Sequence, residues 1–529
     1  MQDRTRFLTD MISEAQQGYS YYEGHIKAMI NAYLLVMDGG QFKWLEERSK
    51  SRLYFPKINA KGKRITDSLT ETYFNNDKFA KLGDYINTDP IIIEKWQNAI
   101  DHYTEMVNLY KTFNPTFQKA PFMPLSIAKV YWNGELCAID DIAVEDIYFD
   151  PQAETTQDVR YLVNKVRMTK SDMERMQKNG IYNKSIDFEN LIQETKPYER
   201  FEIYDVYYQT EDGWELSTIY EESTILQDKV KLKDGQPFVW GHMLPQMKDL
   251  NEDTFVAVYG ESVLASMLPL QEEFNSTRNA MIDGMKQHLA PKMVLPKTAG
   301  ISRLDLETPS KPIFTSQPTG ITVVPPPNLQ SAQDNLQMIE NEASEVSGIS
   351  PQNNGISPQR KETATQASIM ANEGSVRLQG YVRTFNETFF EPIFERLAKL
   401  VWKYGHESFF LGIDRSEVPS FKVSLNTGIG ALNKEVQKQG LLEAYQMVGQ
   451  QTQAFMALQD MDGAKRMIGA SEKIVREVLP LFGIKDIDDF LGKEETLFKG
   501  QKNDINTRAD SIGGLNGQAP ESPQNQRPI

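Results

Sequence analysis

A helix, an insert and a second helix follow one another between residues 260 and 348, and this order constrains the chain more than any other feature. In residues 260–290 the apolar residues recur at intervals of three, four and seven, which predicts a helix with one buried side. These residues are Val263, Met267, Leu270, Phe274, Met281, Met285 and Leu289. Pro269 is placed either to kink this helix or to mark its first turn.

The insert and the second helix differ in composition. Residues 291–327 hold short β-branched runs bounded by prolines, which predict a few small strands and no continuous helix. Asn328 can then cap a second helix, with apolar residues at helical spacing, and Gly348 can end it. This helix carries four carboxylates of one sign, Asp334, Glu340, Glu342 and Glu345.

A loop and a third helix complete the central unit. Residues 349–361 contain two Ser-Pro pairs and Asn353-Asn354-Gly355, which are typical of a turn-forming loop. The third helix starts near Thr363 and runs towards Tyr404, with Pro392 as its expected bend. The pattern therefore predicts two packed helices that must stay together, with the free backbone in the segments between them.

The order of these pieces resembles that of the portal proteins of tailed bacteriophages, most of all those of short-tailed phages. The resembling residues are Gly260-Glu261-Ser262 with Leu270-Gln271 and Asn275, the segment from Val144 to Pro151, and Glu362-Thr363-Ala364-Thr365. The likeness covers roughly residues 40 to 480 in the order of elements. It implies a mainly helical α+β fold, the portal fold, with a wing, a helical stem, a clip, a tunnel loop and a C-terminal helical crown.

The resemblance also implies a division of the chain. The expected parts are a helical N-terminal part of the wing (1–125), a β-rich wing (126–259), a first stem helix (260–290), a clip (291–327), a second stem helix (328–348), a tunnel loop (349–362), a long wing helix with returning strands (363–432), a helical crown (433–499) and a tail disordered in isolation (500–529).

A portal subunit would form a ring, expected to be a dodecamer, at one vertex of the phage head in the virion. The resemblance implies that the ring is assembled in the host cytoplasm and passes double-stranded DNA during packaging and ejection. The implied partners are the terminase large subunit, the head-to-tail adaptor, and the major capsid and scaffolding proteins. The resemblance implies no membrane partner, no enzymatic activity and no cofactor. The alternatives are another virion structural protein, such as a minor capsid or adaptor subunit, or an enzyme that processes nucleic acids.

Three groups of residues are expected to carry the portal function. The clip would meet terminase and adaptor through Lys292, Lys297, Arg303 and Lys311. The second stem helix would turn Asp334, Glu340, Glu342 and Glu345 towards the lumen, although pairing with basic residues of an adjacent stem is an equal alternative. The tunnel loop would contact DNA through Ile349, Ser350, Gln352, Asn353, Asn354, Gly355, Arg360 and Lys361, unless it is a plain connector on the outside.

Composition limits the function classes. A net charge of −16 argues against ordinary duplex-DNA binding, which depends on clustered Lys and Arg. A channel through which DNA must slide needs a wall that does not bind phosphate tightly, and an acidic surface meets this need. An ordinary acidic soluble protein explains the charge equally well. No apolar run approaches the ~18 residues of a membrane span, and no apolar signal core follows Met1, so export is not expected. A single cysteine, Cys137, forms no intrachain disulfide.

The flanking regions predict helices before Ile127 and strands after it, interrupted by a helix near residues 170–176 and a hairpin turn at Asp212-Gly213. Residues 409–411 and 421–425 predict a further strand pair, and residues 433–491 predict helices.

A basic patch lies between the N-terminal helices. It consists of Arg48, Lys50, Arg52, Lys57, Lys61, Lys63 and Arg64. Its interleaving with apolar residues favours a solvated loop or a subunit contact over a nucleic-acid site.

Chemical motifs are weak throughout. Gly62-Lys63-Arg64 lacks the upstream glycine and the hydroxyl residue of a nucleotide-binding loop. The five histidines are far apart in the sequence without a second ligand at metal spacing. Ser262 has no glycine at the position that a nucleophile elbow requires. We therefore expect neither a catalytic nor a metal site.

Overall fold

The computed structural model describes residues 2–37, 51–74, 79–84, 89–193, 198–221, 223–247, 255–289, 328–349, 376–425 and 444–452, with the shorter pieces 43, 47, 196, 293–294, 296, 322–325 and single positions between 455 and 475. The chain divides into two compact units, Met1–Leu432 and Asn433–Ile529. In the second unit, residues 444–452 are helical, and the predicted tail lies outside the described residues. The elements that follow belong to the first unit.

Four helices form most of the N-terminal part. They are α1 (Gln2–Leu34), α3 (Lys57–Phe74), α4 (Pro90–Val107) and α5 (Leu109–Lys119). Asp89 caps α4 by accepting from the Ile91 N–H, and Pro90 occupies the first turn, where a missing N–H costs nothing. Asn108, at a φ of 52°, ends α4 and caps α5. The prediction of helices in this part is confirmed.

One strand in this part was not predicted. Residues Ala80–Asp84 form β1, which pairs antiparallel with β14 (Phe421–Leu425). The predicted pairing between residues 409–411 and 421–425 is therefore wrong, because Glu407–Phe410 form the 3-10 helix η6 instead. Strand β14 finds its partner more than 330 residues earlier in the chain.

Two antiparallel sheets follow. The first has the order β3-β2-β9, with β2 (Ser126–Trp132), β3 (Cys137–Ile142) and β9 (Phe238–Gly241). The second has the order β4-β5-β6-β7-β8, with β4 (Ile147–Phe149), β5 (Tyr161–Thr169), β6 (Arg200–Thr210), β7 (Gly213–Tyr220) and β8 (Thr224–Lys231). Helix α6 (Lys170–Lys178) and the short α7 (Phe188–Leu191) join β5 to β6. The predicted strands, helix and hairpin turn are confirmed.

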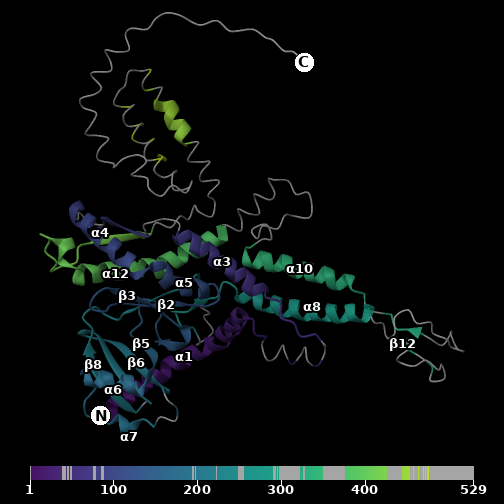
Figure 1. The fold of residues 1–529 in the computed structure, drawn as a ribbon, viewed down its shortest axis with the longest axis horizontal. Coiled ribbons are helices and arrows are strands. Elements are labelled where there is room, and N and C mark those ends of the chain that lie inside the picture. The colour runs from purple at the N-terminus through teal and green to yellow at the C-terminus, as the bar shows by residue number, and fades with distance from the viewer. Residues whose placement is uncertain are drawn as a thin grey trace, which may run out of the picture. The chain divides into compact units, whose positions relative to one another are not determined.

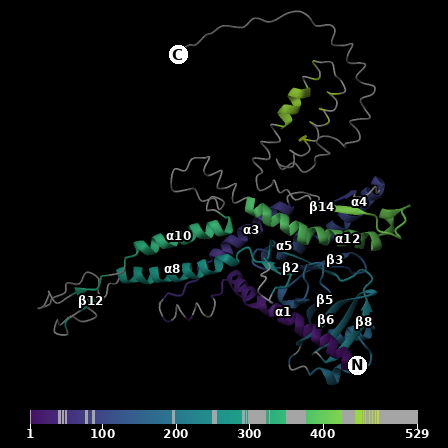
Figure 2. The ribbon, with the colours of Figure 1, turned by 180° about the vertical axis from the view of Figure 1, so that it is seen from behind.

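The central helices form an antiparallel pair. Helix α8 (Leu268–Leu289) follows a 3-10 turn, η2 (Ala265–Met267), so Pro269 lies in its first turn. Helix α10 (Gln330–Ser347) lies beside α8 in both views (Figures 1 and 2). Gly348 ends α10 in the left-handed conformation that favours glycine, and the Asn328 side chain accepts from the Gln330 N–H at 3.0 Å.

The third helix changes its geometry before Pro392. Residues 376–385 are α-helical, η5 (Asn386–Phe390) is a π-helix, and α12 (Glu391–Tyr404) continues the helix. A π turn provides one extra residue, and here Thr388 uses its hydroxyl to bond both the N–H and the carbonyl of His242, at 3.2 and 3.0 Å. The predicted bend thus coincides with a contact to the end of β9.

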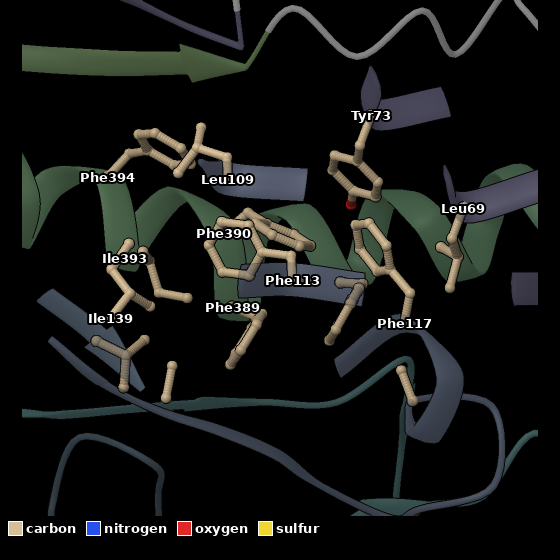
Figure 3. Close-up of a cluster of buried hydrophobic side chains, with 14 of the residues drawn as sticks. Leu69, Tyr73, Leu109, Phe113, Phe117, Ile139, Phe389, Phe390, Ile393 and Phe394 are labelled. Atoms are coloured by element: carbon tan, nitrogen blue, oxygen red, sulfur yellow. The ribbon is translucent and has the colours of Figure 1, made fainter. Parts of the chain in front are cut away.

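The apolar core surrounds this third helix. Phe390 is buried against Phe113, Phe117 and Tyr73, which come from α5 and α3 (Figure 3), and Phe389 is buried beside it. A second cluster packs α1 on the five-stranded sheet. It contains Leu8, Ile12, Leu162, Val163 and Val206, all with no exposed surface. The two clusters hold together the part of the first unit from which the α8–α10 pair extends (Figure 1).

Gly62 tests how tightly α3 packs. A Cβ at this buried position would lie 2.1 Å from an atom of the Phe122 ring, whereas a Cβ at Gly24 in α1 would meet nothing within 4 Å. We expect Gly62→Ala to lower the free energy of unfolding by about 1–3 kcal/mol, because the core is already full. Gly24→Ala should raise it by about 1 kcal/mol through helix propensity alone. Urea unfolding of both variants checks the pair, and equal shifts would contradict the packing described.

Candidate functional site

An extended segment lies along α8 and is bonded to it by polar side chains. We call residues 51–57, which are SRLYFPK, the strap. The N–H groups of Ser51, Leu53, Phe55 and Lys57 donate to side chains of Asp283, Asn279, Asn275 and Gln271, at 3.2, 2.8, 3.0 and 2.9 Å. The amides of Asn279 and Gln271 also donate to the Leu53 and Phe55 carbonyls, at 2.8 and 2.5 Å. The strap therefore runs antiparallel to α8.

The spacing of the two elements explains this pairing. Two residues of extended chain span about 6.6 Å, and four residues of α-helix span about 6.0 Å. Every second strap residue can therefore meet every fourth residue of α8. Asn275 and Asn279 have no exposed surface, and Gln271 has 4%. Their burial is stable because the strap backbone supplies a donor and an acceptor to the amides of Gln271 and Asn279, while Asn275 accepts from the Phe55 N–H and the Gln271 amide.

The sequence contained a signal for this contact. Gln271, Asn275, Asn279 and Asp283 recur at intervals of four, which places them along one side of a helix. Polar residues on one side of a helix ordinarily indicate the solvent side, and here they mark a buried one. Sequence reasoning used Gln271 and Asn275 only as residues that carry a family resemblance.

The end of the strap joins α8 to α10. The Lys57 ammonium lies 4.5 Å from the centre of the Phe274 ring and forms an ion pair with Glu340 of α10. One turn later, Lys61 donates to Ser344 at 3.2 Å and to the Ile349 carbonyl. Two members of the predicted basic patch thus bind α10 within the same chain.

Other members of the patch have different positions. Arg52, Lys63 and Arg64 are exposed, as a solvated segment or a subunit contact requires. Arg48 and Lys50 lie outside the described residues. Burial lowers the pKa of Lys61 to about 8, against the attraction of Glu340, which raises it. Lys61 is therefore a structural group at the base of α10.

The four carboxylates of α10 occupy different sides. Residues of an α-helix are about 100° apart, so Asp334 and Glu345 lie opposite the buried Ala343. Both are exposed, and Gln330 donates to Asp334 at 3.1 Å. Glu342 is partly exposed on an adjoining side, and Glu340 is turned towards Lys57. The four carboxylates were predicted to act as one group. Among the described residues, Glu340 is the member of this group that forms an ion pair.

Described residues on either side of segment 350–375, which contains the predicted tunnel loop beyond Ile349, meet at the end of α10. Ile349 is fully buried in the core cluster, and its N–H donates to Ser347. From the other flank, Arg377 donates to the carbonyls of Glu345 and Val346. Ile349 was expected to contact DNA, and this prediction is wrong for its side chain, which packs inside the chain. Ser350, Gln352, Asn353, Asn354, Gly355, Arg360 and Lys361 lie outside the described residues.

The predicted clip begins and ends as a pair of short strands. Strand β12 (Met293–Val294) pairs antiparallel with β13 (Thr322–Val323) at the far end of the α8–α10 pair (Figure 1). Two residues from each side make this sheet, which is too short to be stable alone. Lys292, Lys297, Arg303 and Lys311 lie outside the described residues.

The described residues show structural uses for groups that could carry chemistry. Ser262 is buried and donates to the Pro121 carbonyl at 3.1 Å. Burial raises the pKa of the Cys137 thiol to about 12. Over the part of the chain that the structure describes, no group of three or more His, Cys, Asp or Glu side chains is placed to hold a metal ion. The helices within that part include none long and apolar enough to cross a membrane.

Residues 43–527 match the family model described as phage SU10 portal protein. The match covers the strap, the α8–α10 pair and the third helix. No curated protein matches the chain.

The contacts of Asn279 predict a stability effect. Asn279→Ala would leave the N–H and the carbonyl of Leu53 without this partner in a partly buried place, so we expect the free energy of unfolding to fall by about 1–3 kcal/mol. The matched control is Ser276→Ala on the same helix, because the Ser276 hydroxyl bonds to a carbonyl of its own helix. Urea unfolding measures both. Equal effects would show that the strap contributes nothing to stability.

Lys61 predicts a pH dependence. Its pKa is lowered in the folded chain, so between about pH 8 and 10.5 the unfolded chain holds more protons, and the folded state gains stability as the pH rises. Lys61→Met removes this gain. Because Lys61 is partly exposed, we expect the free-energy difference between wild type and Lys61→Met to change by roughly 1 kcal/mol across this window. The exposed Lys63→Met is the control, and parallel curves for all three proteins would contradict the assignment.

Proposed function

This chain belongs to the phage SU10 portal protein family, and from this membership we propose how its parts serve the function. The chain is a portal subunit of a tailed-phage head, and its oligomeric ring provides the channel for DNA. The observation that carries this conclusion is the match over residues 43–527, which includes the whole central unit. We propose that the ring is a dodecamer of the short-tailed-phage type, assembled in the host cytoplasm.

The exposed side of α10 is proposed to face the lumen. Asp334 and Glu345 lie on the side of α10 that points away from α8, and a carboxylate repels the phosphates of passing DNA. Glu340 is left out of this role because it is paired with Lys57. The lumen would then present carboxylates from each subunit, which lets DNA slide without binding tightly.

The loop and the clip are proposed to act at the two ends of the α8–α10 pair. Ile349 and Arg377 hold both flanks of the segment between them at the last turn of α10, which supports a tunnel loop that starts and returns at one place. At the other end, β12 and β13 are too short to stand alone, which supports pairing between neighbouring clips. We propose that the clip meets the terminase large subunit before packaging and the adaptor afterwards.

The remaining roles follow from the same proposal. Portal proteins are a structural family that works with terminase and the head, so we propose that the chain catalyses no reaction and leaves ATP hydrolysis to the motor. The major capsid and scaffolding proteins are the proposed neighbours at the head vertex. These roles need a ring with a stable outer surface and an inner surface that does not bind DNA.

Charge reversal in α10 tests this proposal. We expect purified wild-type protein to form rings with a central hole in electron micrographs, and Asp334→Lys with Glu345→Lys to form the same rings. The variant rings should retain linear duplex DNA roughly tenfold more than wild type at low salt, with the excess lost at high salt. Retention measured against NaCl concentration gives the comparison.

The matched control carries the same change of net charge elsewhere. Glu189 and Glu211 are exposed residues of the strand-rich part, and Glu189→Lys with Glu211→Lys should leave DNA retention at the wild-type level. Wild-type protein that stays a compact monomer would overturn the portal function. Disassembled rings in the α10 variant alone would show that Asp334 and Glu345 pair with a neighbouring subunit.

A further inference from the structure

A groove of about 530 Å³ lies between the strap, α8 and α10. Its apolar wall is formed by Phe55 of the strap, Phe274 of α8 and Leu336 of α10. Lys57, Arg278 and Glu340 add charge to this wall, and Lys57 and Glu340 are already paired with each other. The groove therefore combines apolar surface with one further cation, Arg278.

Arg278 is held in place by an aromatic ring and a sulfur atom. Its guanidinium lies 5.8 Å from the centre of the Phe55 ring and donates to the Met281 sulfur at 3.5 Å. Within the described ranges no carboxylate is at ion-pair distance from it. A cation over an aromatic ring keeps its charge available to an anion from outside. The groove thus offers a positioned positive charge in a protein whose net charge is −16.

The opposite side of the α8–α10 pair is acidic. With about 100° per residue, Glu273 lies roughly 120° around α8 from the midpoint of the groove residues Phe274 and Arg278, on the side away from the strap. On α10, the residues that face the groove are Gln333, Leu336, Gln337 and Glu340. Glu342 lies roughly 170° around the helix from the mean direction of these four side chains. Glu273 is exposed, and Asn335 of α10 donates to it at 3.3 Å. This acidic side is defined by Glu273 and Glu342.

We propose that the acidic side of one copy of this chain docks against the groove of the next copy around the ring, with Arg278 as the cation that receives the carboxylates. The proposal rests on the ring assigned to the chain under its proposed function. A ring joins subunits head to tail, so each copy must offer two different and complementary surfaces. The groove and the acidic side are such a pair, since they lie on opposite sides of one hairpin and carry opposite charge.

This arrangement is compatible with the lumen proposed for Asp334 and Glu345. These two residues lie on the side of α10 away from α8, between the groove and the acidic side. The contact between copies thus uses the two flanks of the helix pair and leaves its third side open. A second copy is favoured over DNA because one arginine beside Glu340 provides too little positive charge to hold a duplex.

A charge exchange tests the contact on the full-length chain. Arg278→Glu alone, and Glu273→Lys with Glu342→Lys alone, place like charges against each other across the interface. Each variant should need roughly tenfold more protein than wild type for half assembly in low salt. The combined variant restores opposite charges and should return to within about threefold of wild type. Sedimentation velocity over a concentration series measures the ring fraction.

Controls separate assembly from folding and from the ring itself. Lys184→Glu reverses an exposed cation of the strand-rich part, outside the groove and the basic patch, and should assemble as wild type. Thermal unfolding of each variant as a monomer should match wild type within a few degrees. A combined variant that assembles no better than the product of the two separate defects would overturn the proposal, as would unchanged assembly of every variant.

Two further outcomes would give the groove or the chain a different role. Variants that assemble as wild type but change only DNA retention would assign the groove to DNA and overturn the contact between copies. Wild-type protein that forms no ring at any concentration would overturn the proposed ring and this inference together. Failure of the charge exchange in wild-type-like rings would overturn the inference alone.

Discussion

The hydrogen bonds between the strap and α8 are the contact on which the central part of the structure depends. An amide side chain can donate and accept at once, so Gln271 and Asn279 each satisfy a backbone carbonyl and a backbone N–H of the strap. The strap then continues directly into α3, whose Lys61 reaches the end of α10. One polar contact therefore sets where α8 lies, and through Lys57 and Lys61 it also sets where α10 lies. Apolar packing alone would leave α8 freer to slide along its neighbours.

The aromatic core holds the third helix in place. Phe389 and Phe390 lie in the π turn before Pro392, and rings from α3 and α5 pack against Phe390. The π turn also brings Thr388 to the end of β9. Gly241 leaves room there for the helix backbone, because a Cβ at this position would lie only 2.7 Å from the backbone carbon of Thr388. This joint fixes the third helix to the sheet, and Arg377 of the same helix bonds to the end of α10. The strap and the π turn thus hold the two helices from different directions.

Much of this fold could be predicted from local patterns. Apolar spacing identified α8 and α10, Gly348 marked the end of α10, and alternating residues indicated β5, β6 and β7. Contacts between distant segments could not be predicted in the same way. Strand β1 was missed because Ala80–Asp84 is short and its partner β14 is far along the chain. The role of Asn275 and Asn279 was missed because polar residues along one side of a helix ordinarily indicate the solvent-exposed side, whereas these two are buried. Ile349 was placed in the loop because its neighbours are loop residues, although its side chain completes the core.

The strap has a mechanical consequence. A force along the axis of α8 loads all of its hydrogen bonds to the strap in shear, so they must break together. A force that lifts the strap away from the helix loads them one after another, as in opening a zipper, and needs far less strength. In a portal the moving DNA exerts friction along the channel. If α8 lies along that direction, the strap resists this friction in its strong direction, while it can still be peeled away when the subunit changes shape.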